Sequence, residues 1–307
     1  MQTILITGGT GLIGKAITNQ LLQKEYSVIV VTRKLPVNDV KTPGLSYAIW
    51  DVKQQTIDMD AVKKADHIIH LAGAGVVDKK WTDAYKKEIL DSRTESSSLL
   101  VSSLINNANK VKTIISASAI GWYGADKAGK PFMETDPAAN DFLGDTCKLW
   151  EQSIDPVADI GIRLVKLRTG IVLSNSGGAL AEFKKPIKLG VAGILGDGKQ
   201  IVSWIHVDDL CRMYIAAIEN EHLSGVYNAV APAPVTNKEL TMELAKQMNG
   251  QLFIPLHVPV MALKLMMGER SIEVLKSTTV SAAKIQQAGF SFLYPDITSA
   301  LKQLCNK

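Results

Sequence analysis

The sequence predicts an α/β protein with a doubly wound parallel sheet, followed by a smaller and mostly helical C-terminal lobe. Up to about residue 170, short apolar and β-branched segments alternate with segments of helical periodicity. The first of these segments, residues 4–7, runs directly into a glycine-rich turn and then a helical pattern. Alternation of this kind is typical of a parallel sheet with helices on both faces.

The opening stretch predicts a phosphate site. Gly8, Gly11 and Gly14 separate the first strand from the first helical pattern. A glycine turn lets backbone approach a pyrophosphate, and the helix N-terminus offers unpaired N–H groups with a partial positive charge. The alternative is a tight turn that binds no ligand. The expected contacts to a dinucleotide are made by Gly8, Thr10, Gly11, Leu12, Ile13 and Gly14.

The following elements are predicted in chain order. Strands are expected at 28–32, 45–50, 67–71, 111–116 and 164–168. Helices are expected at about 81–107 and 143–157, and later at about 207–219, 236–248, 259–267, 281–288 and 296–305. We therefore predict a dinucleotide-binding domain over 1–170, to which parts of 200–230 return. The substrate lobe would span 171–307 and include a C-terminal domain from about 250.

Composition limits the class of function. The chain has 307 residues, of which 46% are hydrophobic, and its net charge is only +4, with scattered basic residues. We expect a small-molecule substrate rather than a nucleic-acid or membrane partner, and a monomer or homodimer. Its three cysteines, Cys147, Cys211 and Cys305, lack metal-ligand spacing, which predicts no metal site and a cytoplasmic protein.

The end of the second strand indicates which dinucleotide binds. An acidic residue there would bind the adenosine ribose 2′-hydroxyl, but this chain has Thr32 and Arg33. A guanidinium suits a 2′-phosphate, so NADP(H) is favoured over NAD; Arg33 could instead stack on the adenine or face solvent. Asp51, after the third strand, is placed to accept from the adenine amino group or to serve in a surface turn.

Taken together, these motifs resemble the extended short-chain dehydrogenase/reductases, which have a Rossmann fold. The resemblance covers about residues 1–230. It is carried by Thr7-Gly-Gly-Thr-Gly-Leu-Ile-Gly14, His70-Leu-Ala-Gly73, Ser116-Ala-Ser-Ala-Ile-Gly-Trp-Tyr-Gly124, Leu167-Arg168-Thr-Gly170 and Gly196-Asp-Gly…Ile205-His-Val-Asp-Asp209. It implies further cofactor contacts from Leu71, Ala72, Gly73, Ser92, Ser116, Lys148 and Arg168.

More narrowly, the chain resembles an atypical epimerase-family branch, also described as cell-division-inhibitor-like. This resemblance is carried by Ser92-Arg93, Phe142-Leu…Trp150-Glu151, Ser203-Trp-Ile-His206 and Gly289-Phe-Ser-Phe-Leu-Tyr-Pro295. The branch has a C-terminal domain of unknown function. It implies an epimerase-like protein without identifying a substrate.

Two positions depart from the family pattern. The family catalyses with Tyr-x-x-x-Lys on one helical face, where the ammonium lowers the pKa of the phenol. Lys148 fits the lysine position, but Gly144 then occupies the tyrosine position. Sugar-nucleotide enzymes of the family have an arginine where this chain has Val202, and valine cannot grip a diphosphate.

Candidate catalytic groups remain at the end of the 111–116 strand. Ser118 matches the family's catalytic serine and could orient a substrate oxygen, and Ser116 could substitute for it. Tyr123 is a candidate replacement for the missing acid/base, with aromatic packing as its alternative. We therefore expect an NADP-dependent oxidoreductase or epimerase acting on a small hydroxyl- or carbonyl-bearing molecule. The alternative is an NADPH-binding sensor without turnover.

The lobe and the loop after the fourth strand supply further candidates. His206 titrates near neutrality, although the Asp208-Asp209 pair that follows it favours a structural role in fixing a loop. Lys79, Lys80, Trp81 and Arg93 flank the expected mouth of the site, where they could bind an anionic substrate or simply form a solvated helix start.

Overall fold

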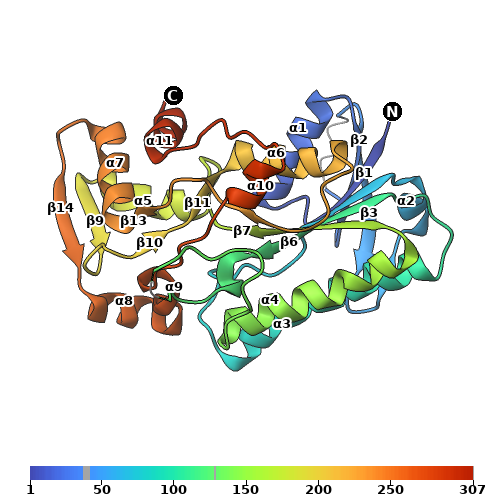
Figure 1. Cartoon of the computed structure of the whole chain (residues 1–307), viewed down its shortest axis with the longest axis horizontal. Helices are drawn as coiled ribbons and strands as arrows, with labels where there is room; N and C mark the ends of the chain where they lie inside the picture. Colours follow the sequence, from blue (N-terminus) through green and yellow to red (C-terminus); the bar gives the residue numbers. More distant parts are fainter. Residues whose placement is uncertain (37–41, 128, 307) are drawn as a thin grey trace.

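The predicted parallel sheet is the centre of the protein (Figure 1). The structure, a computed structural model, describes residues 1–36, 42–127 and 129–306. Its eight-stranded sheet has the order β12-β7-β6-β5-β1-β2-β3-β4, and all neighbours are parallel except β3 and β4. The strands are β1 (Thr3–Thr7), β2 (Ser27–Thr32), β3 (Leu45–Asp51), β4 (Thr56–Ile57), β5 (His67–His70), β6 (Thr113–Ala119), β7 (Arg163–Thr169) and β12 (Gly225–Ala229).

Apolar side chains point alternately to the two faces of the sheet, and helices pack against them on both faces. Ile4 and Ile6 of β1 pack with α1 (Leu12–Gln23) and α6 (Val207–Glu219) in one core cluster. Leu5 points to the other face, where α2 (Met59–Lys64), α3 (Asp83–Ile105) and α4 (Phe142–Ile154) pack. Figure 1 shows α1 and α6 on one side of the sheet and α3 and α4 on the other. The predicted fold class is confirmed.

The predicted helix over 143–157 forms in two parts. The α-helix α4 ends at Ile154, and a 3₁₀ segment, η2 (Asp155–Ile160), follows it. Pro156 lies in the first turn of η2 and has no N–H for an α-helical hydrogen bond. The predicted strand over 111–116 begins two residues later, at Thr113, and extends to Ala119 as β6.

The chain after β7 builds the lobe but also returns to the sheet. The helix α6 covers one face of the sheet, and β12 pairs in parallel with β7. The strands of the lobe form pairs: β8 (Ile171–Leu173) with β11 (Trp204–His206), β9 (Val191–Leu195) with β14 (Ile254–Val258), and β10 (Ile201–Val202) with β13 (Val235–Thr236). Its helical segments are α5 (Ala179–Ile187), α7 (Asn237–Asn249), α8 (Val260–Met267), η3 (Gly268–Arg270), α9 (Ser271–Leu275), α10 (Ala283–Gln287) and α11 (Ile297–Cys305).

The C-terminal segment is fastened to the sheet domain through one buried carboxylate. Asp209 of α6 is completely buried and accepts hydrogen bonds from the backbone N–H groups of Leu293 and Tyr294, both at 2.9 Å. Arg212 donates to the same carboxylate at 2.7 Å. The Asp208-Asp209 landmark therefore fixes a loop, as one reading of the sequence expected.

Candidate functional site

The glycine turn lies between the end of β1 and the start of α1, and it is packed too tightly for side chains. Gly8 has a positive φ of 69°, and a Cβ added to it would lie 2.8 Å from the carbonyl carbon of Leu71. A Cβ on Gly14 would lie under 3.0 Å from the carbonyl oxygen of Gly8. The turn therefore brings backbone to the carboxyl end of the sheet without side-chain bulk.

The N-terminus of α1 is left open beside this turn. Gly11 caps the helix without a side-chain hydrogen bond, and the first turn has no acidic residue. The backbone N–H groups of Leu12 and Ile13 have no acceptor within the part of the chain that the structure describes. Thr10 and Gly11 are exposed. Unpaired N–H groups at a helix N-terminus suit a phosphate, so this cradle fits a dinucleotide.

The end of β2 carries an unpartnered cation. β2 is the neighbour of β1 in the sheet, and Arg33 follows its last residue. Arg33 is exposed and forms no hydrogen bond or ion pair with any described residue, whereas the hydroxyl of Thr32 donates to the carbonyl of Lys34 at 3.0 Å. The guanidinium is therefore available to a ligand that crosses the strand ends.

Asp51 ends β3 and has a structural role in its turn. One carboxylate oxygen, Oδ1, accepts from the backbone N–H groups of Lys53 at 2.9 Å and Gln54 at 3.1 Å. These contacts are the ones expected if Asp51 serves in a surface turn. Its expected contact with the adenine amino group stays a prediction.

The loop after β5 adjoins the glycine turn. The N–H of Leu71 donates to the Thr7 carbonyl at 3.1 Å, and the N–H of Ala72 donates to the Thr7 hydroxyl at 3.3 Å. Ser92 of α3 accepts a hydrogen bond from the N–H of Ala74 at 2.9 Å. Leu71, Ala72 and Gly73 therefore lie beside the cradle, and Ser92 holds their loop in place.

Ser118 has a hydrogen-bond partner inside the protein. It is buried, and its hydroxyl donates to Oε1 of Glu151 at 2.7 Å. A hydroxyl whose hydrogen is committed to a buried carboxylate cannot donate it to a substrate carbonyl. Ser116 is also buried and donates to the carbonyl of Ala117 at 3.2 Å. These contacts give both serines structural partners, and the catalytic role of Ser118 stays a prediction.

Arg168 is the ion-pair partner of the same carboxylate. Its Nε lies 2.8 Å from Oε1 of Glu151 and its Nη2 lies 3.1 Å from Oε2, with both side chains almost fully buried. Its guanidinium also stacks on the ring of Trp122, 3.6 Å from the ring centroid. The donors of Arg168 are used inside the protein, and its expected contact with the cofactor stays a prediction.

Tyr123 completes this buried network and is not a replacement acid/base. Its hydroxyl donates to Oδ1 of Asn228 at 2.6 Å and accepts from Nη1 of Arg168 at 3.1 Å, while its ring stacks on Phe132. Burial raises the pKa of Tyr123 to about 12, although the nearby Arg168 guanidinium acts in the opposite direction. The packing interpretation is the one that the contacts support.

Gly144, the tyrosine position predicted by its spacing from Lys148, is closed by backbone. A Cβ on Gly144 would lie well under 3.0 Å from the carbonyl oxygen of Ala139. The i, i+4 pair that faces the end of β6 is instead Leu143 and Cys147: Cys147 Sγ lies 3.6 Å from the Ala119 carbonyl oxygen. Lys148 is exposed and forms no hydrogen bond or ion pair with a described residue. The register expected from the sequence is therefore displaced by one residue.

Sequence reasoning missed Glu151 as the centre of the polar network. Glu151 is 4% exposed and binds Ser118, Arg168 and, at 3.7 Å, Lys166. The available signal was a carboxylate between Trp150 and Ile154, on the face of α4 that the apolar periodicity buries. A buried carboxylate requires a cationic partner, so the position of Glu151 on this face could have predicted its ion pair with an arginine.

The lobe side of the site has structural rather than catalytic contacts. His206 caps α6 by accepting from the N–H of Asp208 at 3.0 Å, and its other ring nitrogen lies 2.9 Å from Gln303 Oε1. Burial lowers the pKa of His206. Val202 is half-buried and pairs with Val235 in the β10–β13 ladder.

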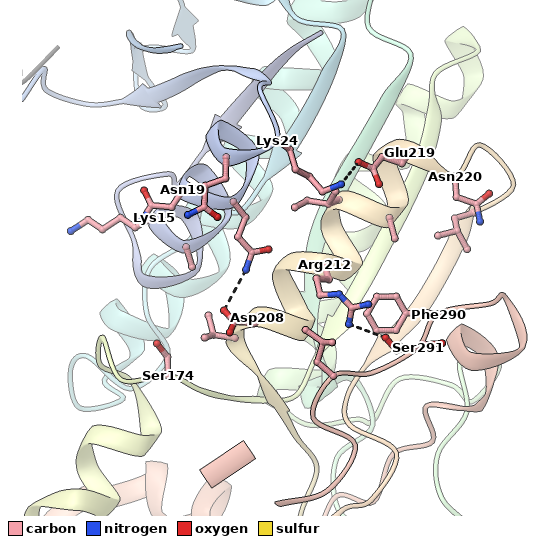
Figure 2. A pocket seen from close by; sticks show the side chains of 18 of the residues that line it. Lys15, Asn19, Lys24, Ser174, Asp208, Arg212, Glu219, Asn220, Phe290 and Ser291 are labelled. Carbon is pink, nitrogen blue, oxygen red and sulfur yellow. Dashed lines mark hydrogen bonds and ion pairs between the residues drawn. The ribbon is translucent and has the colours of Figure 1, made fainter. Parts of the chain in front are cut away.

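A groove of about 1410 Å³ lies between α1, α6 and the segment 288–293, and it reaches Leu12 at the start of α1 (Figure 2). Two of its charged side chains form an ion pair with each other, and a third binds a backbone carbonyl of the C-terminal segment. Lys24 binds Glu219 at 2.8 Å, and Arg212 donates to the carbonyl of Ser291 at 2.8 Å. The groove therefore marks the seam between the C-terminal segment and the outer surface of α1 and α6.

Two classes of site find no support in the part of the chain that the structure describes. No cluster of histidine, cysteine or acidic side chains there could hold a metal ion. Among those same residues, no helix combines the length and apolar character needed to cross a membrane.

The chain is similar to known proteins over its whole length. Residues 4–229 match the family described as NAD dependent epimerase/dehydratase, and residues 258–304 match a domain of unknown function, DUF1731. An epimerase family protein of Staphylococcus aureus (strain MRSA252) is 34% identical over 308 residues, which cover 100% of each chain.

Solved structures give the same result. The structure of human epimerase family protein SDR39U1 with NADPH has a TM-score of 0.85 and 28% identity, and the match covers 99% of each chain. A nucleoside-diphosphate sugar epimerase from Corynebacterium glutamicum has a TM-score of 0.78 and 32% identity, covering 99% of this chain and 58% of that one. The resemblance found in the motifs is thus confirmed, and the chain belongs to the NAD-dependent epimerase/dehydratase family.

Proposed function

We propose that this protein is an NADP(H)-dependent oxidoreductase of the epimerase type that acts on a small hydroxyl- or carbonyl-bearing molecule. The observation that carries the proposal is the open N-terminus of α1 together with Arg33, which follows the neighbouring strand β2 and binds no described residue. The NADPH bound to the human relative supports the choice of cofactor. Binding would extend over the ends of β2, β1, β5 and β6, the neighbours that surround the glycine turn.

Each part of the cradle would hold one part of the dinucleotide. The backbone of Gly8, Gly11, Leu12 and Ile13 would hold the diphosphate, and Arg33 would hold the 2′-phosphate. Leu71, Ala72 and Gly73 would line the nicotinamide half. The bound nicotinamide would supply a hydride donor or acceptor. With the Ser118 hydroxyl bound to Glu151 and the Tyr123 hydroxyl bound to Asn228, proton transfer would fall to water or the substrate itself.

Replacing Arg33 with serine is expected to weaken NADPH binding by about tenfold to a hundredfold while NADH binding stays unchanged. A charge-assisted hydrogen bond contributes roughly 1.5–3 kcal/mol, and about 1.4 kcal/mol is a factor of ten in affinity. Fluorescence titration of both cofactors measures the ratio.

Lys53→Ser is the matched control for this experiment, because Lys53 is an exposed cation just after β3. It should leave both affinities within about twofold of wild type. A wild-type protein that binds NADH as tightly as NADPH would contradict the assignment of NADP(H). An Arg33→Ser protein with an unchanged ratio would show that another group selects the cofactor.

Turnover is tested by nicotinamide absorbance against a panel of aldehydes, ketones and sugars. Oxidation of NADPH by a member of the panel is the expected result. Since the proposed proton donor is water or the substrate, a folded Tyr123→Phe variant should have the same catalytic rate as the wild type. A rate that falls by more than about a hundredfold in that variant would restore Tyr123 as the acid.

A second function, NADPH binding without turnover, is favoured by one specific contact. Cys147, with its Sγ 3.6 Å from the carbonyl oxygen of Ala119, stands where the family's lysine would lie, and Leu143 stands at the tyrosine position four residues earlier. Tight NADPH binding with no oxidation by any panel member would support a sensor or regulatory protein over an enzyme.

A further inference from the structure

Arg93 is a buried cation without a carboxylate partner. It lies on α3 and is only 9% exposed. Its Nη1 donates to the carbonyl oxygens of Ala74 at 3.0 Å and Ile89 at 2.8 Å, and its guanidinium lies 4.9 Å from the centroid of the Trp150 ring. Within the described residues, no carboxylate forms an ion pair with it.

The adjacent edge of this guanidinium carries two unused donors. Nε and Nη2 form no hydrogen bond with a described residue, and neither is among the fully enclosed unsatisfied atoms of that part of the chain. Arg168 shows what this edge can do, because it grips Glu151 through the same two nitrogens. The Nε–Nη2 edge matches both oxygens of a carboxylate or two oxygens of a phosphate.

Its surroundings compensate the charge of Arg93 only in part. Two carbonyl oxygens and an indole face stabilise a cation, but a buried charge normally requires an opposite charge. Burial lowers the pKa of Arg93, although an arginine keeps its proton at neutral pH. In Arg168, by contrast, Glu151 outweighs the effect of burial and the pKa is raised. A ligand anion would give Arg93 the opposite charge that none of the described residues provides.

Arg93 also lies at the nicotinamide end of the proposed cofactor site. A Cβ on Gly73 would lie 3.2 Å from Cγ and Cζ of Arg93. The absence of a side chain at Gly73 therefore lets the guanidinium pack closely against the loop after β5. Two residues earlier, Leu71 contacts the glycine turn at Gly8. Because β5 and β6 would lie under the nicotinamide half, Arg93 is near the proposed reaction site rather than the adenosine.

We propose that Arg93 binds a carboxylate or phosphate group of the substrate at the nicotinamide end of the site, through Nε and Nη2. The substrate would therefore be an anionic molecule that carries a hydroxyl or carbonyl group. This proposal rests on the proposed NADP(H) function. The same chemistry could be met by the diphosphate of the cofactor, and the experiment separates these two sources.

The experiment measures the binding of acetate, malonate and inorganic phosphate by thermal shift and calorimetry, with NADPH-saturated protein. At least one of these anions should bind the wild type, and Arg93→Gln should weaken that binding about tenfold or more. Arg93→Lys keeps the charge without the two-pronged edge and should weaken it by a smaller factor. Lys302→Gln, which removes an exposed cation from α11, should leave it within about twofold.

Other outcomes overturn the proposal. If none of the three anions binds the wild type, or if Arg93→Gln binds them equally well, Arg93 serves only to hold its loop. If Arg93→Gln instead lowers NADPH affinity about tenfold and leaves anion binding unchanged, the guanidinium serves the cofactor. A wild type that does not bind NADPH refutes the proposed function, and the same anion titration without cofactor still tests Arg93. If Arg93→Gln does not fold, Arg93→Lys provides the comparison.

Discussion

Replacing Glu151 with glutamine is expected to lower the free energy of unfolding by about 3–5 kcal/mol, because it leaves a buried charge without its partner. Arg168 would lose an ion pair that engages both carboxylate oxygens, and the Ser118 hydroxyl would lose its charged hydrogen-bond acceptor. Lys166, only 12% exposed, would lose a second carboxylate neighbour. Urea denaturation measures the difference from wild type.

Two further proteins show whether this loss comes from the buried charge. Glu182→Gln breaks an ion pair with Lys185 whose side chains are 70% and 67% exposed, and it should cost less than about 1 kcal/mol. The double variant Glu151→Leu with Arg168→Met removes both charges, and it should be more stable than Glu151→Gln. A Glu151→Gln protein as stable as Glu182→Gln would contradict the role given to this pair.

The sequence was sufficient for the parts of the site that depend on neighbouring residues. The glycine turn is such a part, because a strand, a positive φ at Gly8 and a helix start are encoded within a few residues. The position of Arg33 was likewise predictable, since it follows β2 directly and β2 pairs with β1. Local backbone geometry and sheet order together position this half of the candidate site.

The contacts of Ser118, Arg168 and Tyr123 depend on distant partners, so the motifs alone could not predict them. Ser118 is bound by a residue 33 positions away, and Tyr123 by one 105 positions away. A motif identifies which side chains stand near a strand end, but burial and hydrogen bonding decide whether they face a substrate or one another. Here one buried carboxylate, Glu151, binds Ser118 and Arg168, and Arg168 in turn holds Tyr123.

The one-residue difference between Lys148 and Cys147 has a similar cause. Adjacent positions on a helix are about 100° apart, so a shift of one residue exchanges a buried side chain for an exposed one. Asp141 fixes the register by capping α4 through the N–H of Gly144 at 2.8 Å. The pattern of spacing alone allowed either register, whereas the contact of Cys147 with Ala119 distinguishes them.

Placing a tyrosine four residues before Lys148, as Gly144→Tyr, is therefore expected to damage the fold rather than create a catalyst. The new Cβ would clash with the carbonyl group of Ala139, which is backbone and cannot rotate away as a side chain would. Ala139 is itself held in place, because its N–H donates to the Trp122 carbonyl at 2.7 Å. We expect the free energy of unfolding to fall by about 3 kcal/mol, with no gain in NADPH oxidation.

Lys148→Tyr is the matched control, since it adds the same side chain one helical turn later at an exposed position. Its unfolding free energy should stay within about 0.5 kcal/mol of wild type in the same urea titration. If Gly144→Tyr proved as stable as Lys148→Tyr and oxidised NADPH with a carbonyl substrate, the loop at Ala139 would have to move aside. Gly144 would then be the family's tyrosine position. The contacts of Cys147 with Ala119 and of Gly144 with Ala139 instead indicate that this position is one residue earlier, at Leu143.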